Sequence, residues 1–164
     1  TGEICVAGPA VFAGYYDNPE ANAKAFRNGW FRTGDLGHRD AEGYVYITGR
    51  QPDMYISGGS NVYPREIEEL LLQMDGVSEA AVLGVPDAKW GEVGLGVCVP
   101  EKGRELDPHA LREALRGKLS SYKIPARIIV LSEMPKSGYG KITKKLIRQR
   151  LEESGLLDEG KVTL

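Results

Sequence analysis

The sequence is poor in the residues that build disulfide frameworks and metal centres. It contains two cysteines and two histidines in 164 residues. Cys5 and Cys98 are far apart and each lies in an apolar, strand-like stretch. We therefore expect both to be small buried hydrophobic residues rather than a disulfide or a metal site. His38 and His109 have polar neighbours and no partner at ligand spacing, so neither is expected to be catalytic or to bind a metal.

Strong charge and long hydrophobic runs are also missing. The formal net charge is −2 at pH 7, which argues against a nucleic-acid partner bound through bulk electrostatics. No apolar run approaches the roughly 20 residues that span a bilayer, and no signal-peptide pattern is present, so we expect no membrane span and a cytoplasmic setting. Hydrophobic residues make up 41% and charged residues 27% of the chain. This balance indicates a globular chain with a core.

The pattern of strand, turn and helix signals changes at Gly49–Asp53. Before this point, strand and turn signals surround one short helix, which Asn18 caps and Pro19 begins. After it, apolar runs of strand length alternate with helix signals. Because one-sided strands and helices bury their apolar faces against each other, we expect an α+β fold, with a short mixed sheet flanked by helices after a β-rich segment.

Individual elements follow from local signals. We expect strands near residues 4–6, 10–12, 43–47, 54–56, 80–85, 94–99 and 127–131, and further helices that begin at Pro64, at Pro108 and after Thr143. Thr33–Asp35 is expected to form a polar turn and Ser57–Asn61 a flexible loop. The chain begins in a strand-like stretch, and a strand needs partners, so we expect a fragment of a longer protein.

The most informative segment is Ser137-Gly138-Tyr139-Gly140-Lys141, close to the C-terminus. Its two glycines allow a loop to move and to approach a ligand closely. Lys141 at its end offers a positive charge with three hydrogen-bond donors, which suits phosphate or carboxylate oxygens. The alternative is an ordinary solvated lysine beside a glycine-rich turn.

Four other positions have both a functional and an ordinary interpretation. Asp35 can cap its own backbone or accept hydrogen bonds from the vicinal hydroxyls of a ribose. Arg50 can pair with a surface acid or bind a ligand hydroxyl or phosphate. Gly58-Gly59 can be a plain turn or a close approach to a thin ligand. Trp90, in a polar loop, can cover a core edge or provide a stacking surface for adenine.

Five segments taken together carry a resemblance to a known family. They are Gly2-Glu3-Ile4 to Gly14-Tyr15-Tyr16, Trp30-Phe31-Arg32-Thr33-Gly34-Asp35, Gly49-Arg50-Gln51-Pro52-Asp53-Met54, Ser57-Gly58-Gly59-Ser60-Asn61-Val62-Tyr63-Pro64-Arg65-Glu66-Ile67-Glu68 and Pro135-Lys136-Ser137-Gly138-Tyr139-Gly140-Lys141-Ile142. In this order they resemble the C-terminal third of the AMP-forming, adenylate-producing enzymes, which include acyl-CoA synthetases, peptide-synthetase adenylation domains and beetle luciferases.

The resemblance implies an organisation in two domains and a hinge. Residues 1–49 would end the large adenylation domain, residues 50–53 would form the hinge, and residues 54–164 would be the C-terminal lid. The lid swings between formation of an acyl-adenylate and transfer of the acyl group to a thiol. The family usually has Asp or Lys at the hinge, where this chain has Pro52. Proline fixes φ near −65°, so domain rotation is expected to be biased or slowed.

The resemblance also implies roles for the candidate residues. Lys141 would be the catalytic cation of adenylation, and Asp35 with Arg50 would hold the ribose of ATP. Gly58 and Gly59 would line the tunnel for the pantetheine arm of coenzyme A, and Trp90 would lie near its nucleotide end. Mg²⁺ is implied with ATP, but no ligand for it can be assigned in this chain.

The resemblance favours an acyl- or aryl-CoA ligase, and with it a place in fatty acid metabolism. The segment Gly58–Pro64 and the Trp90-Gly91-Glu92 run both favour free CoA as the acceptor. Two alternatives stay open: delivery of the acyl group to a carrier-protein thiol, and a free-standing lid without catalysis. The fragment alone is expected to be inactive, and the carboxylic acid substrate and oligomeric state stay undefined.

Overall fold

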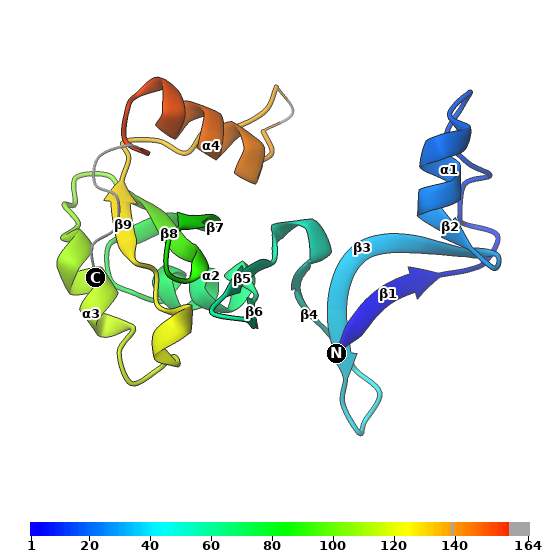
Figure 1. Ribbon diagram of the computed structural model, residues 1–164, viewed down its shortest axis with the longest axis horizontal. Coiled ribbons are helices and arrows are strands. Elements are labelled where there is room, and N and C mark those ends of the chain that lie inside the picture. The colour runs from blue at the N-terminus through cyan, green and yellow to red at the C-terminus, as the bar shows by residue number, and fades with distance from the viewer. Residues whose placement is uncertain (139, 158–164) are drawn as a thin grey trace. The chain divides into compact units, whose positions relative to one another are not determined.

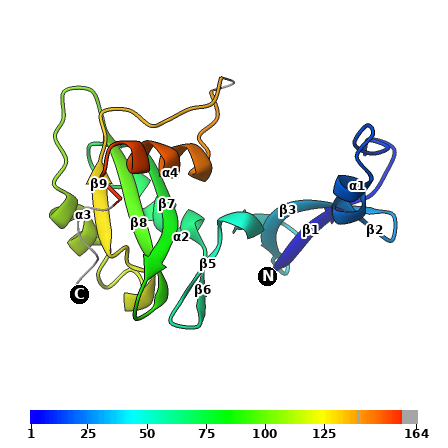
Figure 2. The same ribbon diagram turned by 45° about the horizontal axis from the view of Figure 1, so that its top comes forward.

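The computed structural model describes residues 1–138 and 140–157 of the chain. It divides into two compact units, Thr1–Pro52 and Asp53–Leu164 (Figures 1 and 2). Among the described residues, no helix is both long enough and apolar enough to cross a membrane.

The first unit is an antiparallel sheet built around one long strand. Strand β3 pairs with each of the other three strands. The elements are β1 (Gly2–Val6), α1 (Pro19–Ala25), β2 (Phe26–Arg27), β3 (Trp30–Arg39) and β4 (Val45–Arg50). Helix α1 begins as the sequence predicts, because the Asn18 side chain accepts a hydrogen bond from the Ala21 N–H at 3.0 Å.

Three local predictions for this unit are wrong. Thr33–Asp35 lies inside β3 and forms no turn between elements, since Gly34 at φ +75° lets the strand continue through an irregular stretch. Residues 10–12 form no strand. Phe12 instead packs its ring against Phe26 and Phe31, with centroids 5.5 and 5.2 Å away. Cys5 is exposed, because β1 is an edge strand of the sheet.

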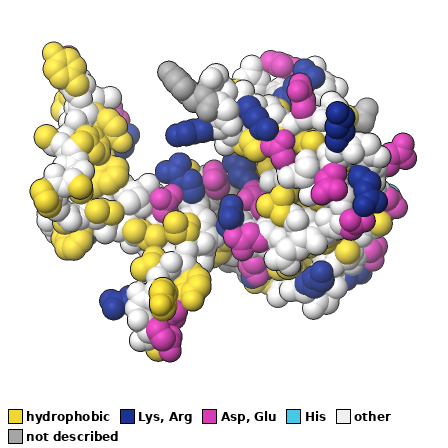
Figure 3. Space-filling model, turned by 180° about the vertical axis from the view of Figure 1, so that it is seen from behind, with side chains coloured by type: hydrophobic (Ala, Val, Ile, Leu, Met, Phe, Trp, Pro, Cys, Tyr) yellow, Lys and Arg dark blue, Asp and Glu magenta, His cyan; other side chains and the backbone are white. Residues whose placement is uncertain are grey.

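Large apolar side chains are unusually exposed on the first unit (Figure 3). Tyr16 is 99% exposed, Tyr44 70% and Ile47 62%. Trp30 and Val45 are also more than half exposed. Large apolar side chains exposed to this degree are typical of surfaces that pack against another part of a protein.

The second unit is a mixed sheet with helices on both faces, which confirms the predicted α+β class. Strands β7 and β8 form an antiparallel hairpin, β9 runs parallel to β8, and the β5–β6 hairpin joins β8 at Ser57. The elements are η1 (Gln51–Asp53), which leads in from the first unit, β5 (Tyr55–Ser57), β6 (Ser60–Val62), α2 (Pro64–Leu72), β7 (Val77–Asp87), β8 (Gly91–Pro100), α3 (Pro108–Ala114), η2 (Ser121–Lys123), β9 (Arg127–Val130) and α4 (Lys144–Glu153).

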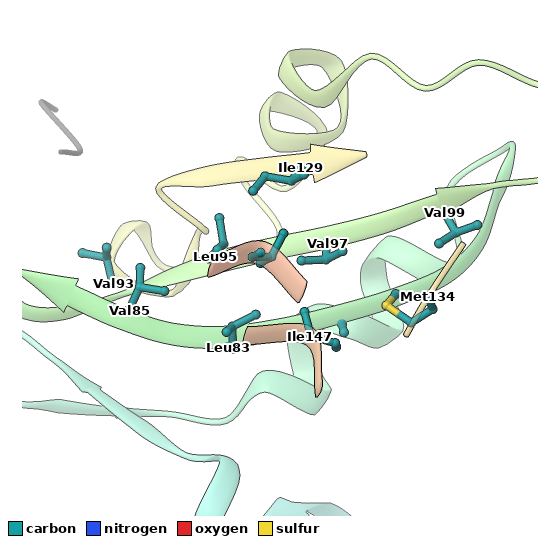
Figure 4. Packing of buried hydrophobic residues seen from close by; sticks show 11 residues of the cluster. Leu83, Val85, Val93, Leu95, Val97, Val99, Ile129, Met134 and Ile147 are labelled. Carbon is teal, nitrogen blue, oxygen red and sulfur yellow. The ribbon is translucent and has the colours of Figure 1, made fainter. Parts of the chain in front are cut away.

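Side chains that alternate along the strands pack into two separate hydrophobic cores. On one face, Leu83 and Val97 pack with Ile147 and Leu151 of α4 (Figure 4). The other face carries Val82 and Cys98, among others, and packs against α2 and α3. Because successive strand residues point to opposite faces, neighbours such as Val82 and Leu83 bury into different cores.

The segment Ser57–Asn61 is a tight hairpin and not the flexible loop that its composition suggests. Gly58 and Gly59 form the two-residue turn between β5 and β6, with φ of +55° and +80°. Two consecutive positive φ angles are typical of a type I′ turn, whose twist matches that of the flanking strands. The hairpin gives both glycines a defined position beside β8.

Candidate functional site

Lys141 lies at the end of a loop whose two ends are joined. Lys136 and Ile142 form an antiparallel bridge across its base. The Ser137 N–H donates to the Lys141 carbonyl at 2.8 Å, and the Lys141 N–H donates to Ser137 Oγ at 3.2 Å. The Lys141 side chain is exposed. Tyr139, in the middle of this motif, lies outside the described residues.

The start of α4 follows this loop directly. Thr143 caps the helix, since its Oγ1 accepts a hydrogen bond from the Leu146 N–H at 3.3 Å. The cap is the one the sequence predicts. It sets Lys141 three residues before the first residue of a helix that is itself packed into the core through Ile147. The cation is therefore on a short, anchored segment.

Asp35 and Arg50 are brought together in the first unit. They are cross-strand partners of β3 and β4, and Arg50 Nε donates to Asp35 Oδ1 at 2.8 Å. Arg50 Nη2 also donates to the Thr33 carbonyl at 3.3 Å. The hydroxyl of Thr33 accepts from the Asp35 N–H at 3.0 Å and donates to the Ile4 carbonyl at 2.8 Å. The pair thus presents one carboxylate and one guanidinium from adjacent strands.

Trp90 and Gly58 are in direct contact in the second unit. The Gly58 N–H donates to the Trp90 carbonyl at 2.9 Å, and a Cβ at Gly58 would lie 2.7 Å from Trp90 Cε3. Asp87 positions the turn that carries Trp90, because its Oδ1 accepts from the Lys89 and Trp90 N–H groups. Gly59, by contrast, has no atom within 4 Å of the position that a Cβ would occupy.

A cavity of about 220 Å³ opens beside this contact. It combines aromatic walls with guanidinium groups, a lining that suits a ring system with attached phosphates. Its lining residues are Ser57, Trp90, Val93, Arg112, Arg116, Ser121, Tyr122, Ile124 and Ala126. The described residues of the Lys141 motif do not belong to this lining, so the structure places the sequence-predicted residues of the second unit on separate loops.

Sequence reasoning missed Tyr122, Arg112 and Arg116. The two arginines are four residues apart, one on α3 and one just beyond it, so they project from the same side of the helical segment. Arg112 Nε donates to the Pro125 carbonyl at 2.9 Å, which ties the end of α3 to the start of β9. The sequence signal that could have identified Tyr122 is its position as an aromatic residue in the polar stretch Ser120–Lys123.

Among the described residues, no group of three or more His, Cys, Asp or Glu side chains could hold a metal ion. Each unit offers its own groups: the first carries the Asp35 carboxylate with the Arg50 guanidinium, and the second carries the Lys141 cation and the aromatic surface of the cavity. These groups can bind anionic oxygens, hydroxyls and a ring, as a nucleotide presents them.

Comparisons with known proteins show that the chain is similar to one part of several CoA ligases. A family model described as the AMP-binding enzyme C-terminal domain matches residues 66–141. The chain is 43% identical over 159 residues to an indoleacetate–CoA ligase of Aromatoleum aromaticum, an alignment that covers 97% of this chain and 31% of that enzyme. It is 46% identical over 149 residues to a feruloyl-CoA synthase of an Amycolatopsis species, covering 91% of this chain and 30% of the synthase.

A solved structure agrees with these relatives. ATP-bound MatB from Rhodopseudomonas palustris is 42% identical and superposes with a TM-score of 0.85, over 93% of this chain and 31% of that one. The chain therefore spans about a third of the length of the proteins that it matches.

Proposed function

We propose that this chain, whose residues 66–141 match the AMP-binding enzyme C-terminal domain, forms the C-terminal part of an ATP-dependent, AMP-forming carboxylate–CoA ligase. The observation that carries the proposal is that the second unit bears two different sites on separate loops. One is the exposed cation of Lys141, and the other is the Gly58–Trp90 contact with its cavity. Two sites on one small unit suit two successive half-reactions.

In the first half-reaction a carboxylate oxygen attacks the α-phosphorus of ATP, which forms an acyl-adenylate and releases pyrophosphate. Negative charge gathers on the oxygens around the reacting phosphorus. Lys141 supplies a fixed cation there, and a preorganised charge stabilises the transition state more than water does. Asp35 and Arg50 hold the ribose hydroxyls of the nucleotide, and their ion pair orients the carboxylate for this task. Mg²⁺ accompanies ATP in this proposal, with no ligand assigned to this chain.

In the second half-reaction the thiol of coenzyme A attacks the acyl carbon, the thioester forms and AMP leaves. The thin pantetheine arm passes Gly58 and Gly59, where a side chain would obstruct it. Trp90 stacks near the nucleotide end, and the guanidinium groups of Arg112 and Arg116 in the cavity attract its phosphates. This basic lining favours free CoA over a carrier-protein thiol as the acceptor.

The domain assignment is part of the same proposal. Residues 1–49 end a large adenylation domain, residues 50–53 are the hinge with Pro52, and residues 54–164 are the lid. The division between compact units at Pro52 supports this assignment. The exposed apolar side chains of the first unit also support it, since they would pack against the rest of a larger domain. A cytoplasmic setting and a place in fatty acid metabolism are expectations that accompany it.

Half-reaction kinetics test the proposal in the longer protein. We expect acid-dependent ATP–pyrophosphate exchange and, with CoA added, release of an acyl-CoA thioester detectable by mass spectrometry. Lys141→Ala should reduce the exchange by on the order of a hundredfold or more while thioester formation from supplied acyl-adenylate persists. The isolated 164-residue chain should show no exchange.

Three results would contradict this function. They are robust exchange by the isolated chain, a longer protein without acid-dependent exchange, and a Lys141→Ala variant that adenylates normally. If the longer protein transfers the acyl group to a carrier protein and not to free CoA, the acceptor is a carrier-protein thiol and not CoA.

A further inference from the structure

The loop that carries Lys141 is tied to the core at both ends by lysine–glutamate pairs. Before the loop, Lys136 Nζ lies 3.0 Å from a carboxylate oxygen of Glu79 on β7. After it, Lys144 at the first position of α4 pairs with Glu68 on α2. The second tie is the better shielded, because the side chains of Lys144 and Glu68 are only 23% and 14% exposed. A shielded pair is screened less by solvent than a surface pair.

The Lys144–Glu68 pair is also joined to the backbone of β7. Glu68 Oε1 accepts a hydrogen bond from the Val82 N–H at 2.8 Å, and Lys144 Nζ donates to the Val82 carbonyl at 2.6 Å. Strand β7 lies at the edge of its sheet, so its outward backbone groups have no neighbouring strand. The two side chains therefore satisfy both outward groups of Val82 and connect α2, β7 and α4 at one point.

A second basic residue of α4 repeats the contact. Arg148 Nη2 donates to the Gly84 carbonyl at 2.6 Å. Residues 144 and 148 are one helical turn apart, and residues 82 and 84 are successive outward positions of the strand. Helix α4, which covers one face of the sheet, thus also reaches the open edge of β7 through two side-chain contacts, which restrict both its position and its rotation.

We propose that Lys144 and Glu68 are positioning residues for Lys141, an inference that rests on the proposed ligase function. Lys141 precedes Lys144 by three residues, so the chain between them spans at most about 10 Å. Any shift of the start of α4 must therefore reach Lys141. Displacing a reacting group by about 1 Å can cost on the order of a hundredfold in rate. The half-buried pair makes the cation available to adenylation at one fixed place on the lid.

The kinetic test separates positioning from simple loss of structure. In the longer ligase, Lys144→Met should lower acid-dependent pyrophosphate exchange by on the order of tenfold to a hundredfold. Thioester formation from supplied acyl-adenylate should be unchanged, because that step does not use Lys141. Lys144→Arg, which keeps the charge, should recover part of the exchange rate, and Glu68→Gln should resemble Lys144→Met.

Helix α2 provides a matched control. Arg65 pairs with Glu69 on the same helix, at 2.7 Å, but both side chains are more than half exposed. Arg65→Met should leave both half-reactions unchanged. Equal losses in both half-reactions for Lys144→Met, or no loss in either, would overturn the positioning role.

A second measurement, on this chain alone, does not depend on ligase activity. Amide hydrogen exchange by NMR should show a loss of protection at Gly140 and Lys141 in the Lys144→Met variant, while the β8 amides stay protected. Unchanged protection at both loop amides would overturn the structural link. Protection at Gly140 and Lys141 that depends on Lys144, in a longer protein without adenylation activity, would contradict the proposed function. It would still confirm that the Lys144–Glu68 pair holds the loop in place.

Discussion

Gly58 lies against the indole ring of Trp90, so close that a Cβ at this position would come within 2.7 Å of Trp90 Cε3. The two residues come from different hairpins, and the Gly58 N–H donates to the Trp90 carbonyl at 2.9 Å. Tight packing and a main-chain hydrogen bond together hold the tryptophan in the lining of the cavity. Of the two turn glycines, Gly58 therefore fixes the position of a side chain that lines the cavity.

The Gly58–Trp90 contact predicts that Gly58→Ala moves the indole. The added methyl meets an aromatic ring, and overpacking of this kind costs about 1–3 kcal/mol. We expect a lower midpoint in urea unfolding of this chain and, in the longer ligase, a raised KM for CoA with adenylation unchanged. For the urea midpoint, Gly59→Ala is the matched control, because φ is also positive there but no atom lies within 4 Å. An equal loss of stability in the two variants would assign the effect of Gly58→Ala to backbone strain instead of the contact with Trp90.

The Asp35–Arg50 pair predicts a selective effect on the nucleotide. Both side chains are at least one-third exposed, so the ion pair itself should contribute less than about 1 kcal/mol to stability. Asp35→Asn should lower kcat/KM for ATP by on the order of tenfold to a hundredfold, because a charged hydrogen-bond acceptor is lost. It should also reduce the preference for ATP over 2′-deoxy-ATP. An unchanged preference would leave Asp35 as a structural partner of Arg50.

Pro52 predicts a slow domain rotation. It lies in η1, at the division between the two compact units, and its ring fixes φ. Pro52→Asp in the longer ligase should accelerate whichever half-reaction limits turnover, since both backbone angles become free to change. Single-turnover measurements of adenylation and of thioester formation provide the test. Unchanged rates for both steps would show that rotation is not restricted here.

The burial of the Cys98 thiol predicts that the folded chain loses stability in alkaline solution. Burial raises the pKa of this thiol to about 11 from its ordinary value of 9.0. The folded state therefore holds the proton more tightly, so its stabilisation is complete below about pH 9 and falls as pH rises towards 11. A shift of this size corresponds to at most about 3 kcal/mol. The pKa of Tyr55 is raised too, mainly by burial and then by Glu92, which acts in the same direction.

Urea unfolding of this chain at pH 8 and pH 10.5 measures the effect. We expect a lower free energy of unfolding at the higher pH and a smaller difference in Cys98→Ala. In the folded chain at pH 8, a thiol reagent should modify the exposed Cys5 and spare Cys98. A pH dependence that is identical in Cys98→Ala would assign the loss to other groups.

Local signals were sufficient where a structure depends on residues close in sequence. Asn18 and Thr143 cap their helices as predicted, through hydrogen bonds to backbone groups three residues away. Thr33–Asp35 shows the opposite case. Its composition is that of a turn, but cross-strand pairing such as that of Asp35 with Arg50 keeps it within β3. Non-local hydrogen bonds outweigh a weak local preference, and no window along the sequence reveals them.

The sequence by itself determined the family resemblance, the α+β class and the residue types that could bind a nucleotide and a thiol cofactor. Those depend on side-chain chemistry and on periodic patterns within single elements. Only the tertiary structure decided that Trp90 packs on Gly58, that Tyr122 and two arginines share its cavity, and that Glu68 ties down Lys144. These contacts join residues from different elements, and the packing of the sheet against its helices brings those elements together.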